Sequence, residues 1–283
     1  MPSLRVTSIG TTLANADGLC GLCGAWGRRS RAHVPPQAAG NTTTVLRAAD
    51  RIDAGQRGPG RWVAGGMQVR GLCVDCNNLA GRTCDLAYAD FARQIRARRS
   101  SSLRVPMIQP AEPPLAMFAP GLVARSVLMG MFAIAPQLRV VLPEVAHDLL
   151  HAPRAVRWPG RTRLCVALTH SDLDRHGLLT SGLSMMRVLG QRELHSPLAE
   201  IVFPPLVWTL VPDHPADRLG YEVTSDLPDA SDWIRYAPER TSVDLRNLLR
   251  HLPVFVHPLH TAHSEWMELS GEHTVLLHGA LSP

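Results

Sequence analysis

Four of the six cysteines form two Cys-x-x-Cys pairs, Cys20 with Cys23 and Cys73 with Cys76. Such a turn aims two thiolates at one point, and two turns together complete the closed tetrahedral shell of a structural zinc ion. In a reducing compartment, paired thiols are metal ligands more often than disulfides. We therefore expect one zinc ion bound by these four residues. A redox-active pair is the alternative, but it would require no second pair.

The elements that must position these cysteines follow from turn signals and periodicity. The sequence predicts a β-hairpin around a polar, Gly-rich turn, with strands at Thr42–Leu46 and Arg61–Val69. The 49 residues between the pairs exceed a compact zinc ribbon, so they predict an inserted element whose ends the metal holds together. After Cys76 the spacing becomes helical, with one apolar stripe formed by Cys84, Tyr88, Phe91 and Ile95.

The order of these motifs is a cysteine pair, His-Val-Pro-Pro, a β-hairpin, a cysteine pair followed by Asn, and a helix. It resembles the HNH endonuclease family, whose fold is the ββα-metal motif. The resemblance is to the zinc-stabilised members, which carry Glu-His-Val-Pro-Pro and Cys-x-x-Cys-Asn-x-x-x-Gly segments. It covers residues 18 to 99, about one third of the chain. The matching residues are Cys20, Cys23, His33, Val34, Pro35, Pro36, Cys73, Cys76, Asn77 and Gly81.

The resemblance implies a one-metal nuclease site. His33 would be the general base that activates water, because the pKa of imidazole lies near neutrality. A magnesium or manganese ion would clamp the phosphate. Asn77 stands where the family has a metal ligand, and Asp85 is a carboxylate that could assist. Gln68 stands near the family's middle asparagine and could hold the loop or His33.

Two positions depart from the family pattern. Ala32 stands where an acidic residue normally precedes the histidine, and Gln68 replaces the middle asparagine. Two hypotheses follow. The first is a metal-dependent endonuclease that hydrolyses phosphodiester bonds, with DNA as the expected substrate. The second is a zinc-stabilised module that has lost catalysis and binds nucleic acid or a protein. In that case His33 would cap a turn, Asn77 would bond a thiolate, and Asp85 would be helix surface.

Charge is distributed unevenly along the chain. All 29 basic residues are arginine; residues 1–105 carry 15 of them against six acidic residues, a net charge of +9. Residues 106–283 carry 14 arginines against 18 acidic residues, a net charge of −4. The N-terminal part is therefore predicted to bind a polyanion such as DNA, although a solvated basic face would have the same composition.

The chain is predicted to be α+β, with an HNH-like zinc-bound ββα-metal domain at 1–105 and a larger α+β domain at 106–283. Residues 100–114, rich in Ser and Pro, predict a linker between them. The second domain has no assigned function and could form a homo-oligomer or bind a protein partner. Its expected helices are Gly121–Ala135 and Val140–His151, and its expected strands are Arg163–Thr169, Leu178–Val188, Ile201–Val211 and His273–His278.

Several functional classes have no support. Met1–Gly10 lacks an export signal, so a cytoplasmic protein is expected, and Gly121–Ala135 is too short for a membrane span. We find no Gly-rich phosphate loop, Ser-His-Asp order or Gly-x-Ser-x-Gly motif, so no residues that bind an organic cofactor are predicted. The histidines at 251, 257, 260 and 263 could bind a transition metal, but Pro258 opposes the helix that would align them.

Overall fold

The computed structural model describes fifteen segments of the chain. They are residues 17–42, 45–51, 56–57, 61–102, 117–152, 155–160, 162–169, 176–181, 187–189, 192–194, 198–212, 228–237, 243–244, 252–255 and 275–280.

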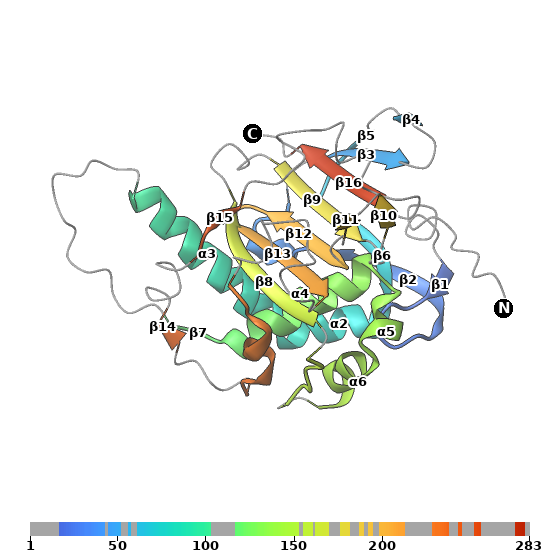
Figure 1. Cartoon of the computed structure of the whole chain (residues 1–283). Helices are drawn as coiled ribbons and strands as arrows, with labels where there is room; N and C mark the ends of the chain where they lie inside the picture. Colours follow the sequence, from blue (N-terminus) through green and yellow to red (C-terminus); the bar gives the residue numbers. More distant parts are fainter. Residues whose placement is uncertain are drawn as a thin grey trace.

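Helices and strands mix throughout these segments, which confirms the α+β class (Figure 1). The helices are α2 (Val74–Thr83), α3 (Asp85–Ser102), α4 (Pro120–Ile134), α5 (Leu138–Val141), α6 (Pro143–His151) and the 3-10 helices η1 (Gln37–Ala39) and η5 (Ser231–Arg235). The strands are β1 (Asp17–Leu19), β2 (Trp26–His33), β3 (Val45–Arg51), β4 (Gln56–Arg57), β5 (Arg61–Val63), β6 (Gln68–Cys73), β7 (Met117–Phe118), β8 (Thr162–Thr169), β9 (His176–Ser181), β10 (Arg187–Leu189), β11 (Arg192–Leu194), β12 (Ala199–Phe203), β13 (Leu206–Pro212), β14 (Val243–Asp244), β15 (Val254–Phe255) and β16 (Val275–Ala280).

A small antiparallel sheet, ordered β1-β2-β6, carries both cysteine pairs. The first pair forms the turn between β1 and β2, and Cys73 ends β6 where α2 begins. The pairing of β2 with β6 places His33 opposite Gln68, and a bulge lies between Ser30 and Ala32. Two antiparallel strands therefore lead directly into a helix, although the partner of β2 is β6 and not the separately predicted hairpin.

The larger sheet is ordered β15-β8-β13-β12-β9-β16-β3-β4, with β5 paired to β3. The predicted hairpin exists in part, as β3 with β5 and β4 on the edge of this sheet. Its first strand runs on to Arg51, and the expected strand Arg61–Val69 is divided, because Arg61–Val63 forms β5 whereas Gln68 and Val69 belong to β6. The expected strand Ile201–Val211 is a hairpin, because two consecutive prolines at 204 and 205 interrupt it between β12 and β13. The expected helix Val140–His151 is also divided, with Leu142 separating α5 from α6.

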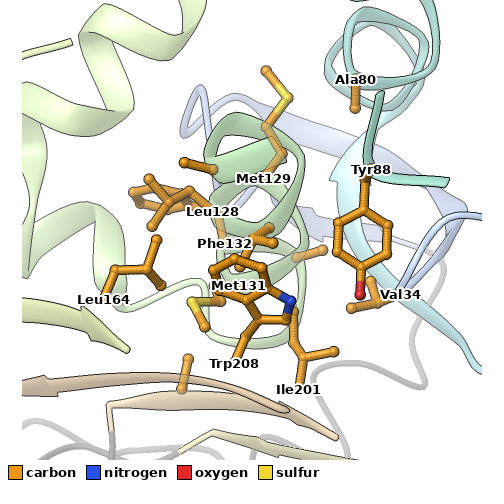
Figure 2. Packing of buried hydrophobic residues seen from close by; sticks show 14 of the residues in the cluster. Val34, Ala80, Tyr88, Leu128, Met129, Met131, Phe132, Leu164, Ile201 and Trp208 are labelled. Atoms are coloured by element: carbon orange, nitrogen blue, oxygen red, sulfur yellow. The ribbon is translucent and has the colours of Figure 1, made fainter. Parts of the chain in front are cut away.

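The helix α4 lies beneath the larger sheet and is buried along almost its whole length (Figure 1). Figure 2 shows its side chains Leu128 and Met131 beside Trp208 of the sheet. On the other side of α4, Val34 follows directly after β2, and Tyr88 comes from α3. One continuous apolar core therefore joins residues on both sides of the predicted 105/106 boundary.

That domain boundary stays a prediction, since residues 103–114 of the expected linker lie outside the described residues, and 100–102 end α3. The four clustered histidines at 251–263 also lie outside them. Of the helices that the structure describes, none has the length and hydropathy that a membrane span needs.

Candidate functional site

The four predicted cysteines gather at one point. Their sulfur atoms all lie within 4.8 Å of one another, and Sγ of Cys23 is 3.8 Å from Sγ of Cys73. Cys20 and Cys76 are buried, whereas Cys23 and Cys73 are half-buried. Four thiolates at this separation suit a closed tetrahedral metal site. The cluster can therefore hold a metal ion, as the cysteine spacing predicted.

Local backbone geometry makes the first cysteine pair a tight turn. The amide of Gly24 donates to the carbonyl of Cys20 at 2.9 Å, and Gly24 has a φ of +75°, which a residue with a side chain rarely adopts. The amide of Cys73 donates to the sulfur of Cys20 at 3.3 Å. A hydrogen bond from Cys76 and that amide lower the pKa of Cys20 to about 4, so its thiolate is favoured.

His33 ends β2 and is held by a backbone carbonyl. Its Nε2 atom lies 2.8 Å from the carbonyl oxygen of Gly65, and only an N–H on Nε2 can donate there. The Gln68 amide nitrogen donates to the same oxygen at 2.9 Å and lies 3.0 Å from the ring nitrogen. In the neutral ring, the lone pair is then on Nδ1. Gln68 therefore holds the loop through the Gly65 carbonyl. It does not hydrogen-bond the ring in this tautomer, because both nitrogen atoms are donors.

His33, Asn77 and Asp85 line the same open pocket of about 470 Å³. Asn77 lies in the first turns of α2, and Asp85 begins α3. The Asn77 amide nitrogen donates to the carbonyl of Arg31 at 3.4 Å. The side-chain oxygen of Asn77 takes no part in that bond, so it can coordinate a metal ion. The remaining lining residues are Pro36, Gln37, Asn78, Gly81 and Arg82.

Asp85 is held from the other side of the core. The hydroxyl of Ser126, a buried residue of α4, donates to Oδ1 of Asp85 at 2.8 Å. Burial raises the pKa of the Asp85 carboxyl, because desolvation disfavours its charged form. A Cβ at Gly81 would stand 4.0 Å from Oδ2, so the glycine leaves space beside that oxygen. Oδ2 is thus the oxygen available to a ligand.

The residue before His33 is Ala32, so this position supplies no carboxylate. Ala32 is buried and lines a narrower space of about 20 Å³, which also touches His33, Asn77 and Asp85. Asp85 is the only carboxylate among the residues that line either of these two spaces.

Sequence reasoning missed Asn41, which organises the loop under His33. Asn41 is fully buried; its amide nitrogen donates to the carbonyls of Pro35 and Met67 at 2.7 and 3.0 Å. Its oxygen accepts from the amide of Met67 at 2.6 Å. A Cβ at Gly66 would lie 2.2 Å from the carbonyl oxygen of Asn41. The Gly40-Asn41 dipeptide signals a turn, but nothing in it signals these contacts.

Comparisons with known proteins add no relative: no family model, no curated protein and no solved structure matches this chain.

Proposed function

We propose that the chain is a metal-dependent endonuclease of the HNH type that hydrolyses phosphodiester bonds of nucleic acid, with DNA as the expected substrate. The observation that carries the proposal is the convergence of His33, Asn77 and Asp85 on one pocket of about 470 Å³. The pairing of β2 with β6, which leads directly into α2, is the order expected for a ββα-metal motif. In this proposal the ion of the cysteine cluster is zinc and stabilises the fold.

The donor atoms of the pocket fit a small hard cation. Oδ2 of Asp85 and the side-chain oxygen of Asn77 would hold magnesium or manganese. Such an ion commonly uses one or two carboxylates, waters and substrate phosphate as ligands. When bound, it would polarise the phosphate and stabilise the charge on the leaving oxygen. It would also offset the desolvation that raises the pKa of Asp85.

The protein's own contribution is a positioned base. Because Nε2 of His33 donates to Gly65, Nδ1 accepts the proton of a water molecule. The oxygen of that water forms a bond to phosphorus, and the bond from phosphorus to the leaving sugar oxygen breaks. The leaving oxygen takes a proton from solvent. Arg82 lines the pocket and offers a guanidinium suited to the phosphate.

Residues 1–105, with their net charge of +9, are the proposed nucleic-acid contact. Each neutralised phosphate releases counterions, so affinity for a DNA duplex should fall steeply as salt rises. Binding that is absent at low salt, or that does not change with salt, would contradict this contact.

The decisive experiment is single-turnover cleavage of plasmid and single-stranded DNA with magnesium, manganese or EDTA. We expect metal-dependent cutting that falls about 100-fold to 10,000-fold in His33→Ala, the usual contribution of a general base. His151→Ala is the matched control, because it removes an exposed histidine of α6. Absence of cutting by the wild type, or equal rates in His33→Ala, would refute the proposal.

A second candidate function is a zinc-stabilised module that binds nucleic acid or a protein without catalysis. The observation that favours it is Ala32, because β2 contributes no carboxylate to the pocket. This candidate predicts salt-dependent DNA binding, or capture of a protein partner, without metal-dependent cutting.

A further inference from the structure

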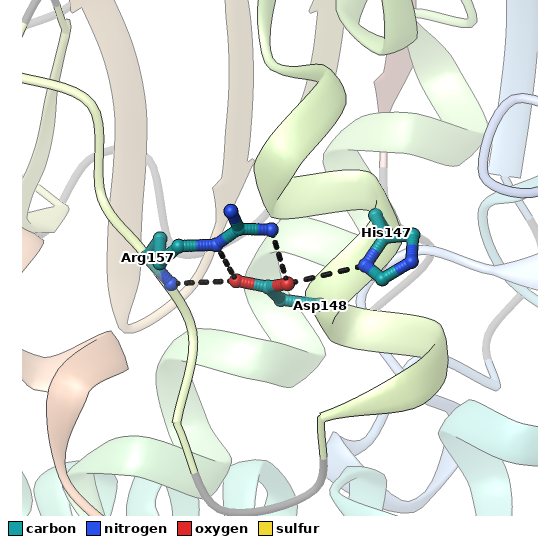
Figure 3. Close-up of polar contacts among 3 residues, drawn as sticks. All are labelled: His147, Asp148 and Arg157. Atoms are coloured by element: carbon teal, nitrogen blue, oxygen red, sulfur yellow. Dashed lines mark hydrogen bonds and ion pairs between the residues drawn. The ribbon is translucent and has the colours of Figure 1, made fainter.

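A separate cluster of titratable side chains lies on α6. Figure 3 shows the ring of His147 facing the carboxylate of Asp148, with Nδ1 at 3.2 Å from Oδ1. An ionised carboxylate can only accept a hydrogen bond, so Nδ1 carries the hydrogen. The lone pair of the neutral ring is therefore on Nε2.

Arg157 keeps that carboxylate ionised and fixed. Its backbone amide and its Nε atom donate to Oδ2 of Asp148, each at 2.9 Å, and Nη2 donates to Oδ1 at 2.9 Å. These bonds hold the pKa of Asp148 well below its usual range. The Asp148 side chain is only 6% exposed, whereas that of His147 is 64% exposed. A buried acceptor thus orients a ring that solvent can reach.

His151 places a second imidazole beside the first. It lies four residues after His147, and side chains at this spacing share one face of a helix. The two ring centroids are 4.8 Å apart, with 56° between the ring planes. Two histidines at this helical spacing can bind one zinc ion, as they do in helices with a His-Glu-x-x-His sequence.

We propose that His147 and His151 bind one divalent transition-metal ion of the class that prefers imidazole, such as zinc or nickel. Water would complete the coordination, since both histidines are exposed. Asp148 is a positioning residue in this site, because a carboxylate that accepts from the second ring nitrogen fixes the tautomer of a metal-binding histidine. The site is separate from the cysteine cluster and does not depend on the proposed nuclease activity.

Nickel binding to the full chain, with zinc already loaded at the cysteines, tests the proposal. We expect calorimetry to detect one nickel site in the wild type. The affinity for nickel should fall at least about tenfold in His147→Ala and in His151→Ala, because even the loss of an outer-shell partner weakens metal binding by that factor. His260→Ala is the matched control, because it changes the histidine-rich run near the C-terminus, and it should bind like the wild type.

The melting temperatures of the variants show whether a loss of nickel binding comes from a folding defect. Without nickel, both α6 variants should melt like the wild type, because the two side chains are exposed. Nickel should raise the melting temperature of the wild type and of His260→Ala more than that of either α6 variant. Failure of the wild type to bind nickel, unchanged binding in both α6 variants, or loss of binding in His260→Ala would overturn the proposal.

Discussion

Gly71 in β6 lies against the carbonyl of Ala133 in α4 so closely that a Cβ at position 71 would stand 1.7 Å from that oxygen. The turn of the first cysteine pair makes a similar approach, since a Cβ at Gly21 would lie 2.0 Å from the carbonyl oxygen of Phe132. The amide of Gly21 also donates to the carbonyl of Gly71 at 2.7 Å. The two cysteine-bearing segments therefore pack directly against the backbone of α4.

Gly71→Ala should destabilise the protein by at least about 2 kcal/mol, because the added methyl group must displace the backbone of α4 or β6. Chemical denaturation measures this change. Gly160→Ala is the matched control, because a Cβ there would meet no atom within 4 Å. A Gly71→Ala protein as stable as the control would show that the two elements separate easily.

Removal of the metal should unfold the region around the small sheet. We expect one zinc ion per chain, and Cys73→Ser should lose it together with ordered structure, since metal binding is coupled to folding. Elemental analysis and circular dichroism measure both quantities. Cys165→Ala should keep its zinc, because Cys165 lies outside the cluster. Purified protein without zinc, or a fully folded Cys73→Ser, would contradict this prediction.

Asn41→Ala should cost about 2 to 4 kcal/mol of stability, because it leaves buried backbone groups of Pro35 and Met67 without their partners. If the nuclease proposal holds, cleavage by the folded fraction should also fall, since the loop that carries the Gly65 carbonyl would shift. Denaturant titration and single-turnover rates separate the two effects. Unchanged stability would mean that water replaces the amide.

Asp85→Asn should leave the protein at least as stable as the wild type at pH 7, while metal-dependent cleavage falls. The pKa of Asp85 is raised in the folded state, so its stabilising contribution is present at low pH and is lost as pH rises through that pKa. At neutral pH the half-buried charge therefore opposes folding, and a neutral amide removes it. Melting temperature and cleavage rate are the two measurements. A clear loss of stability would show that the charge is needed for folding.

Asp148→Asn should destabilise the protein at pH 7 by about 1 to 3 kcal/mol, a modest value because the Arg157 side chain is two-thirds exposed. The pKa of Asp148 is depressed, so its contribution is present above the usual value of 3.8 and is lost as pH falls through the folded-state pKa. The difference between the two proteins should therefore shrink below pH 3.8. A difference independent of pH would rule out the ion pair as its source.

Local sequence patterns predicted the elements and much of the site. The stripe Cys84, Tyr88, Phe91 and Ile95 is buried, because its spacing follows one helical face. The two cysteine pairs meet although they are distant in sequence, because a tetrahedral metal site needs the two ligands that each pair supplies. His33, Asn77 and Asp85 line one pocket, whereas the roles that the family resemblance implies for them stay predictions.

Contacts between distant segments could not be predicted in this way. Ser126 bonds Asp85 only because α4 packs across α3, and no pattern near either residue signals that crossing. The pairing of β2 with β6 likewise joins strands separated by a hairpin of its own. The close approach of Gly71 to Ala133 depends on how β6 and α4 pack in three dimensions, which no local sequence pattern indicates.

The position of β16 in the larger sheet affects how the chain can fold during synthesis. This strand, made last among the described elements, pairs with β3 on one side and β9 on the other. The ribosome must therefore synthesise the chain through β16 before β3 gains this neighbour. Such non-local pairing slows folding, because a long loop must close before its contacts form. We infer that the edge of β3 that pairs with β16 stays unpaired while the ribosome is still synthesising the middle of the protein.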